Sequence, residues 1–167
     1  MGKNELAVFG CGCFWGIQYV FDKIKGVTKT EVGYMGGDEN KWPDPSYDDV
    51  CKNETGYAEV VRIEYDPEKI SYDLLLDVFW RSHDPTTINQ QAADFGTQYR
   101  SVIFYYDSEQ KKTAEESLKK VQKLIAKKIV TQISKAGKFI PAEDYHQKYA
   151  DKNGPRSCHI PRNPYLN

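Results

Sequence analysis

The order in which the apolar residues change their spacing along the chain most constrains the fold. Strand-like alternation or short apolar runs and helix-like spacing follow one another as strand, helix, strand, strand, helix, strand. This order predicts an α+β fold, a ferredoxin-like two-layer sandwich with a mixed, mainly antiparallel sheet. The predicted strands are residues 6–9, 27–34, 57–65, 99–106 and an edge strand at 129–133, and the predicted helices are 14–24, 72–82, one starting at 108 and a short one at 142–151.

Two long polar loops interrupt this pattern, at about residues 36–56 and 83–98. Loops of that length are often functional. The chain of 167 residues contains no internal repeat and no linker, so we expect one domain over residues 1–167, ending in an irregular tail at about 152–167.

Composition excludes several partners. The formal net charge is −1 and 28% of the residues are charged, which gives no basic footprint, so we expect no nucleic acid as a partner. Residues 1–20 lack the features of a signal peptide, and no apolar run reaches the ~18 residues of a membrane span. We therefore expect a cytoplasmic location without membrane contact.

Cys13 follows a glycine-containing turn and stands at the first turn of a predicted helix. Unpaired N–H groups and the helix dipole favour a thiolate there, and a thiolate is a nucleophile. A buried cysteine that merely fills the core would suit the same position. The four cysteines do not have paired zinc-ligand spacings, although Cys11-x-Cys13 and Cys158-His159 come near, so no metal is expected.

Glu59 lies on the apolar face of a predicted strand, because it shares its parity with Val61, Ile63 and Tyr65. Burial would raise the pKa of this carboxyl and keep it available as an acid. A glutamate at a sheet edge that reaches solvent is the alternative.

The chain resembles the methionine sulfoxide reductase A family over residues 5–158. Six strings carry the resemblance in the family's order: Gly12-Cys13-Phe14-Trp15-Gly16, Val32-Gly33-Tyr34 with Gly36-Gly37, Thr55-Gly56-Tyr57-Ala58-Glu59-Val60, His83-Asp84-Pro85-Thr86-Thr87, Gly96-Thr97-Gln98-Tyr99-Arg100-Ser101 and Ala142-Glu143-Asp144-Tyr145-His146-Gln147. The resemblance implies reduction of methionine S-sulfoxide, free or in proteins, without a metal or organic cofactor.

The resemblance also implies roles for single residues. Cys13 corresponds to the nucleophile that attacks the sulfoxide sulfur, and Glu59 to the acid that protonates the sulfoxide oxygen. The remaining matches are Tyr34 and Tyr99 for the phenols that hydrogen-bond this oxygen, Phe14 and Trp15 for the aromatics that hold the substrate methyl group, and Asp94 for a carboxylate that binds substrate through water.

Recycling follows from the same resemblance. Attack leaves a sulfenic acid on Cys13, which a second thiol can convert to a disulfide. Cys158 stands at about the spacing of the family's first recycling cysteine, so it is the expected resolving thiol in a redox-active tail, with thioredoxin as the reductant. Cys11 and Cys51 remain possible partners.

Two family charges are replaced together, because Gln18 stands where the family commonly has Glu and Gln90 where it commonly has Arg. One hypothesis is that a neutral amide pair replaces a Glu–Arg contact between the first helix and the second long loop. Other functions that the thiol and the aromatics would allow are a thiol peroxidase, a cysteine hydrolase, and a module that binds methionine sulfoxide without reducing it.

Overall fold

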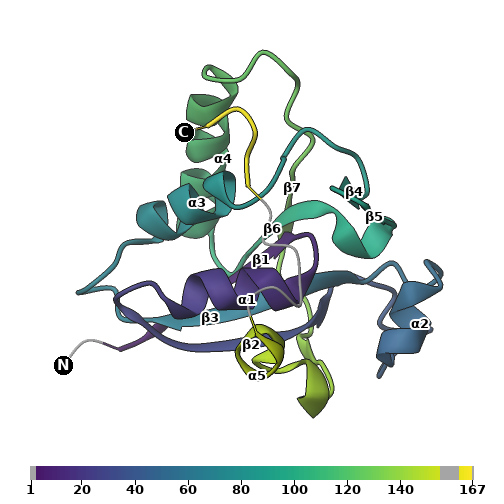
Figure 1. Ribbon diagram of the computed structural model, residues 1–167. Helices are drawn as coiled ribbons and strands as arrows, with labels where there is room; N and C mark the ends of the chain where they lie inside the picture. Colours follow the sequence, from purple (N-terminus) through teal and green to yellow (C-terminus); the bar gives the residue numbers. More distant parts are fainter. Residues whose placement is uncertain (1–2, 155–161, 167) are drawn as a thin grey trace.

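The structure, a computed structural model, describes residues 3–154 and 162–166. Six strands form one sheet in the order β7-β6-β1-β3-β2-β8, and only β6 and β7 pair in parallel (Figure 1). The sheet is therefore mixed and mainly antiparallel, as predicted. Its strands are β1 (Glu5–Cys11), β2 (Val27–Met35), β3 (Ala58–Tyr65), β6 (Ser101–Tyr105), β7 (Gln132–Lys135) and β8 (Ile140–Pro141).

The four central strands, β6-β1-β3-β2, are joined by α1 (Phe14–Asp22) between β1 and β2 and by α3 (Tyr72–Arg81) between β3 and β6. This is the ferredoxin-like connection, so the predicted fold class is confirmed. A longer helix, α4 (Ser108–Gln122), starts after Asp107, whose side chain accepts a hydrogen bond from the Gln110 N–H at 2.8 Å.

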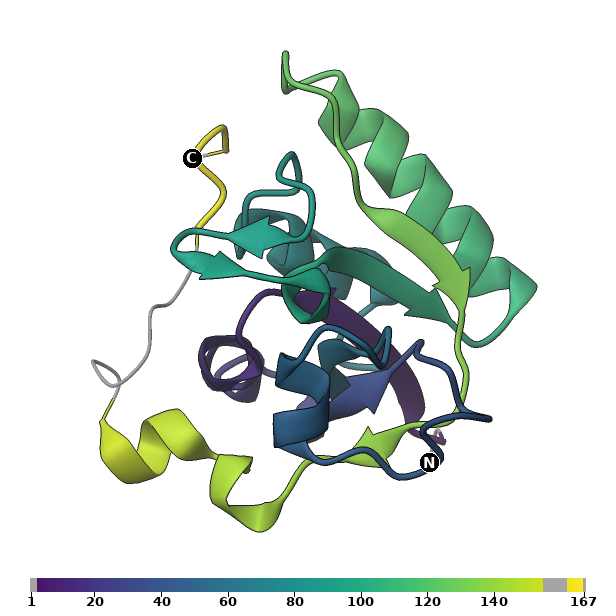
Figure 2. The same ribbon diagram turned by 90° about the vertical axis from the view of Figure 1, so that its right-hand side faces the viewer.

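The main core lies between the helices and one face of the sheet. The ring of Phe9 on β1 lies 5.7 Å from that of Phe21 on α1 and 5.1 Å from that of Phe79 on α3. A smaller cluster, which includes Val8 and Phe104, occupies the opposite face and packs against residues between β7 and β8. In Figure 2, α1 is seen end-on to one side of the strands, and the segment between β7 and β8 runs down the other side.

Short elements fill the two long loops, which the sequence pattern did not predict. The first loop contains α2 (Tyr47–Cys51), and the second contains a hairpin of β4 (Gln90–Gln91) and β5 (Asp94–Phe95). The second loop ends in a 3-10 turn, η1 (Thr97–Tyr99), so the predicted strand at 99–106 starts only at Ser101.

The helix predicted at 142–151 is wrong, because two short helices replace it. A 3-10 turn, η2 (Asp144–His146), is separated from α5 (Tyr149–Asn153) by Lys148, whose φ of 57° cannot continue a right-handed helix. An edge strand is present, as predicted, but it lies at Gln132–Lys135 rather than at 129–133.

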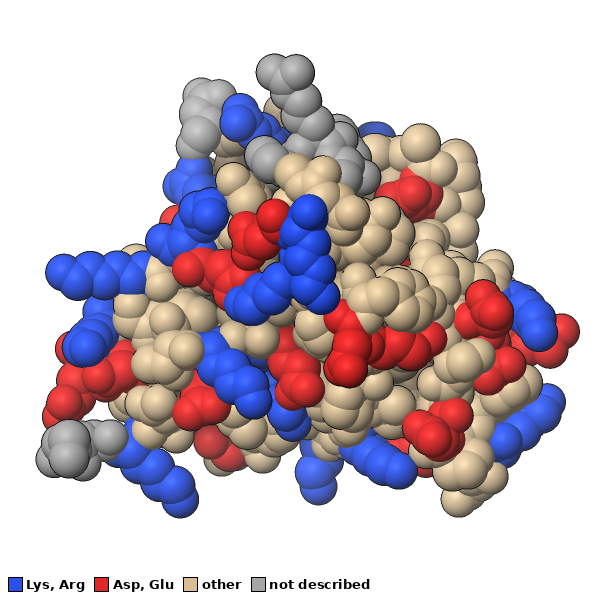
Figure 3. Space-filling view, turned by 60° about the horizontal axis from the view of Figure 1, so that its bottom comes forward, with Lys and Arg blue, Asp and Glu red and all other residues tan. Residues whose placement is uncertain are grey.

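Residues 162–166 form no helix or strand but are attached to the domain. The Asn163 side chain is buried, its amide donates to the Trp80 carbonyl at 2.8 Å, and its backbone N–H donates to the Arg81 carbonyl at 3.0 Å. No helix among the described residues is long and apolar enough to span a bilayer. Acidic and basic side chains are interspersed over the face drawn in Figure 3.

Candidate active site

Cys13 lies at the junction between β1 and α1. Gly12 has a φ of +97°, and a Cβ there would lie 2.9 Å from the Gln91 side chain, so both conformation and space require glycine. The turn places Cys13 at the N-cap of α1, where it is half-buried. Its thiol therefore lies at the positive end of a helix of nine residues, which stabilises a thiolate.

Glu59 on β3 lies against the same helix end. Its side chain is 1% exposed, and Oε1 accepts a hydrogen bond from the Phe14 N–H at 3.3 Å. Burial raises the pKa of this carboxyl to about 8; the Phe14 hydrogen bond opposes the shift and the charge of Asp94 adds to it. The burial and the raised pKa predicted from strand parity are thus both confirmed.

The second carboxyl oxygen of Glu59 has different surroundings from the first. Oε2 is buried and forms no hydrogen bond with any residue that the structure describes. With a pKa of about 8, the carboxyl is mainly protonated at neutral pH. Since the Phe14 N–H occupies Oε1, the proton belongs on Oε2, which is then a donor without a partner in the described protein.

The two aromatics after Cys13 have different surroundings. Phe14 is 1% exposed, and its ring lies 5.8 Å from that of Tyr34. Trp15 is half-buried; its indole stacks on Tyr149 at 3.9 Å and 11°, and Nε1 donates to His146 Nδ1 at 2.9 Å. One aromatic therefore belongs to the core, and the other is held between side chains from the C-terminal part of the chain.

Tyr99 and Asp94 lie near Glu59, whereas Tyr34 is engaged elsewhere. Burial raises the pKa of the half-buried Tyr99 phenol, as do the nearby Glu59, Asp94 and Cys13. Tyr34 is directly opposite Glu59 in the strand register, but it is fully buried and donates to Glu143 Oε1 at 3.1 Å.

Tyr47 is a site residue that the sequence analysis missed. Its ring lies 6.5 Å from that of Phe14 and 4.4 Å from that of His146. Burial raises the pKa of its phenol most, followed by the charge of Glu59 and a hydrogen bond with the Cys51 sulfur. The capping box of α2 pairs Ser46, directly before Tyr47, with Asp49, two residues after it, and is a signal that could have located this helix within the loop.

The other cysteines are less suited to form thiolates. Cys11 is the last residue of β1 and 1% exposed, and burial raises the pKa of its thiol. Burial also raises the pKa of the half-buried Cys51 thiol, although the Tyr47 hydroxyl opposes this shift. Cys158 lies outside the described residues.

His83 is structural. It is fully buried, and its ring nitrogens lie 2.7 Å from the Phe79 carbonyl on α3 and 2.7 Å from Ser101 Oγ on β6. Burial lowers its pKa to about 4, so the ring is neutral at physiological pH. In residues 3–154 and 162–166, no three His, Cys, Asp or Glu side chains gather as metal ligands would.

A family model described as peptide methionine sulfoxide reductase matches residues 5–167. This chain belongs to the peptide methionine sulfoxide reductase family. It is 53% identical over 151 residues to "Peptide methionine sulfoxide reductase A4, chloroplastic" of Arabidopsis thaliana, covering 90% of this chain but only 57% of that relative's length. It is 50% identical over 165 residues to the reductase MsrA of Methanothermobacter thermautotrophicus, covering 97% of this chain and 95% of that relative.

Solved structures of the reductase family have the same fold. Reduced Mxr1 of Saccharomyces cerevisiae superposes with a TM-score of 0.91 at 38% identity, covering 99% of this chain and 93% of that one. Mxr1 in complex with Trx2 superposes with a TM-score of 0.62 at 27% identity, covering 89% of this chain and 86% of that one.

The suggested contact between Gln18 and Gln90, where this chain departs from the reductase family, is wrong. The buried Gln18 amide donates to Thr30 Oγ1 at 3.2 Å and accepts from the Lys148 N–H at 2.8 Å. Gln90 instead donates to the carbonyl of Ala92 within its own hairpin. Each amide bonds to other partners, so the two glutamines do not form a pair.

Proposed function

We propose that this chain reduces methionine S-sulfoxide, free or in proteins, to methionine, with Cys13 as the nucleophile and Glu59 as the acid. The observation that carries the proposal is the shared helix end. Cys13 caps α1, and the first N–H of the same helix donates to the buried Glu59 carboxyl. A thiolate at the helix end and a protonated carboxylic acid on β3, bonded to the N–H of the residue after Cys13, can thus coexist at neutral pH.

The chemistry needs both groups. A sulfoxide oxygen is a poor leaving group until it is protonated, and Glu59 Oε2 is the donor available for it. The Cys13 sulfur attacks the sulfoxide sulfur, and an S–S bond forms as the protonated oxygen leaves as water. A water molecule then attacks the Cys13 sulfur, the S–S bond breaks, and the products are methionine and a sulfenic acid on Cys13. The methionine sulfur is reduced by two electrons and the cysteine sulfur is oxidised by two.

Phenols and aromatics complete the substrate site in this proposal. Phe14 and Trp15 hold the substrate methyl group, Asp94 binds substrate through water, and Tyr99 hydrogen-bonds the sulfoxide oxygen. Tyr47 suits the same task as Tyr99, because its hydroxyl is bonded to a sulfur, a weak acceptor that it can leave at low cost.

Tyr34 stays a prediction for this oxygen-binding role. Its hydroxyl would first have to leave the stronger Glu143 carboxylate, which also accepts the Tyr47 N–H at 3.1 Å.

For recycling, we propose that the Cys158 thiol condenses with the sulfenic acid on Cys13, releasing water and forming a disulfide that thioredoxin reduces by exchange. The complex of Mxr1 with Trx2 supports this reductant. Residues 1–167 would then act as one catalytic domain with a redox-active C-terminal segment. A reducing compartment suits such a cycle, and we propose the cytoplasm, although two relatives are named as chloroplastic.

Single-turnover reduction of the two enantiomers of methyl p-tolyl sulfoxide, without added reductant, tests the proposed function. We expect about one equivalent of methyl p-tolyl sulfide from the S enantiomer and none from the R enantiomer. Binding without sulfide formation would indicate a recognition module, and reaction with hydrogen peroxide or an ester alone would indicate a peroxidase or a hydrolase.

A further inference from the structure

A four-residue segment, residues 146–149, contacts Trp15 through its first and last residues. Its two middle residues contact α1 and β2. His146 accepts the Trp15 indole N–H, and Tyr149 stacks on the indole face. Gln147 and Lys148 instead bind α1 and β2. We call residues 146–149 the bracket.

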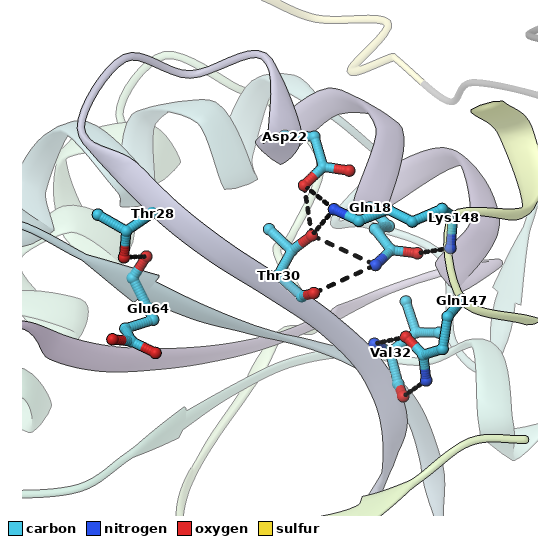
Figure 4. A network of polar contacts seen from close by, with 8 residues as sticks. All are labelled: Gln18, Asp22, Thr28, Thr30, Val32, Glu64, Gln147 and Lys148. Atoms are coloured by element: carbon cyan, nitrogen blue, oxygen red, sulfur yellow. Dashed lines mark hydrogen bonds and ion pairs between the residues drawn. The ribbon is translucent and has the colours of Figure 1, made fainter. Parts of the chain in front are cut away.

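Lys148, whose own side chain is 43% exposed, attaches the bracket to a polar cluster in which Gln18 and Thr30 are buried. Its Nζ forms an ion pair with Asp22 Oδ1 at 2.6 Å and donates to Thr30 Oγ1 at 3.0 Å, while its backbone N–H donates to Gln18 Oε1 at 2.8 Å. In Figure 4 these four side chains converge between α1 and β2.

The Thr30 hydroxyl is bonded to the other three side chains of this cluster. It accepts from Gln18 Nε2 and from Lys148 Nζ and donates to Asp22, which uses its one proton and both lone pairs. Thr30 is 5% exposed and Gln18 is 1% exposed, so water cannot readily replace these bonds. The cluster thus holds Lys148 in its left-handed conformation, which turns the chain toward Trp15.

Gln147 makes a second attachment, to the edge of β2. Its side-chain amide accepts from the Val32 N–H at 3.0 Å and donates to the Val32 carbonyl at 2.9 Å, so it continues the hydrogen bonding of β2 beyond its pairing with β8 (Figure 4). The bracket is therefore fixed to the scaffold at two successive residues.

From this arrangement we infer that the cluster of Gln18, Asp22, Thr30 and Lys148 is a positioning device for the substrate pocket, which acts through the bracket to fix the Trp15 indole. The inference rests on the proposed function, in which Trp15 holds the methyl group. An indole held on its face and at its nitrogen can discriminate a methyl group from a larger alkyl group. An indole that is not held could move aside and accommodate both groups. Thr30 is therefore a specificity-determining residue that does not touch the substrate.

Thr30→Val tests this inference, with Thr28→Val as the matched control. Both substitutions keep a β-branched shape on the same strand, but the Thr28 hydroxyl bonds to Glu64 and Asn4, away from the cluster (Figure 4). For Thr30→Val we expect a 5- to 10-fold higher KM for methyl p-tolyl sulfoxide with kcat changed less than about twofold, and a similar loss of preference over ethyl p-tolyl sulfoxide. Thr28→Val should retain wild-type values.

Fluorescence provides a readout that does not depend on activity. The chain has three tryptophans, so a Trp42→Phe, Trp80→Phe background leaves Trp15 as the only tryptophan, excited selectively at a wavelength that the tyrosines do not absorb. Adding Thr30→Val should shift the Trp15 emission to the red and increase its quenching by acrylamide, and adding Thr28→Val should not.

Equal KM, alkyl preference and quenching in the two threonine variants would overturn the inference, even if Thr30→Val alone lowered the thermal midpoint. A wild-type chain that reduces no sulfoxide would refute the proposed function instead, and the quenching comparison would still decide whether the cluster fixes Trp15.

Discussion

Glu59→Gln isolates the buried acid, and the structure predicts how it changes the dependence of stability on pH. The glutamine oxygen can still accept the Phe14 N–H, so the packing is retained while the titrating proton is removed. In the wild type, the Glu59 pKa is about 8 when folded, against an ordinary value of 4.5. Between these values the folded state holds a proton that the unfolded state has lost.

The sign of the pH dependence of stability follows from the raised pKa of Glu59. A raised folded pKa contributes stability that is fully present below 4.5 and is lost as the pH rises through about 8. Within this window the free energy of unfolding of the wild type, minus that of Glu59→Gln, should fall by about 1.4 kcal/mol per pH unit, or about 5 kcal/mol in total. Urea titrations of both proteins at four or five pH values measure this difference, and other groups such as His83 cancel in it.

Glu59→Gln should also change the rate of sulfoxide reduction. Loss of the proton donor should slow the single-turnover rate by ~10²–10⁴. The wild-type rate should also fall as the pH rises through about 8, and this fall should be absent from Glu59→Gln. A stability difference that stays constant from pH 5 to 8, or an unchanged rate in Glu59→Gln, would refute the argument that Glu59 is a buried, protonated acid.

Four further substitutions, two of them combined in one comparison, test other parts of the account. Cys13→Ser should abolish sulfoxide reduction and leave the circular dichroism spectrum unchanged, and residual turnover above a few per cent would exclude Cys13 as the nucleophile. Gln18→Glu and Gln90→Arg should have additive effects on the free energy of unfolding to within about 0.5 kcal/mol, since the two side chains do not meet, and a larger coupling would contradict this. Cys158→Ser should still form one equivalent of methionine per enzyme but should sharply slow thioredoxin-driven turnover, whereas full turnover would assign resolution to Cys11 or Cys51.

The long periodic segments could be predicted from the sequence because their patterns report burial directly. The parity that places Glu59 with Val61 and Ile63 on β3 correctly predicted a buried carboxyl, and the predicted helix start at residue 108 is the start of α4. In both cases a local pattern determines the local structure.

The short elements could not be predicted in the same way. A two-residue strand such as β4 is too short to show a period, and its place depends on contacts with distant segments. The break at Lys148 depends on Gln18, Asp22 and Thr30, more than a hundred residues earlier in the chain, and no local signal marks it. The substrate side of the site is therefore where sequence reasoning was least complete.

The position of the sulfenic acid after one turnover tests the central claim most directly. Cys158→Ser enzyme is mixed with methionine S-sulfoxide, treated with dimedone, which reacts with sulfenic acids, and digested for peptide mass mapping. We expect about one dimedone per chain and none after methionine R-sulfoxide, with the adduct on Cys13, which fragmentation of the peptide distinguishes from Cys11 two residues before it. An adduct on Cys11 or Cys51, or methionine formed without any adduct, would contradict it.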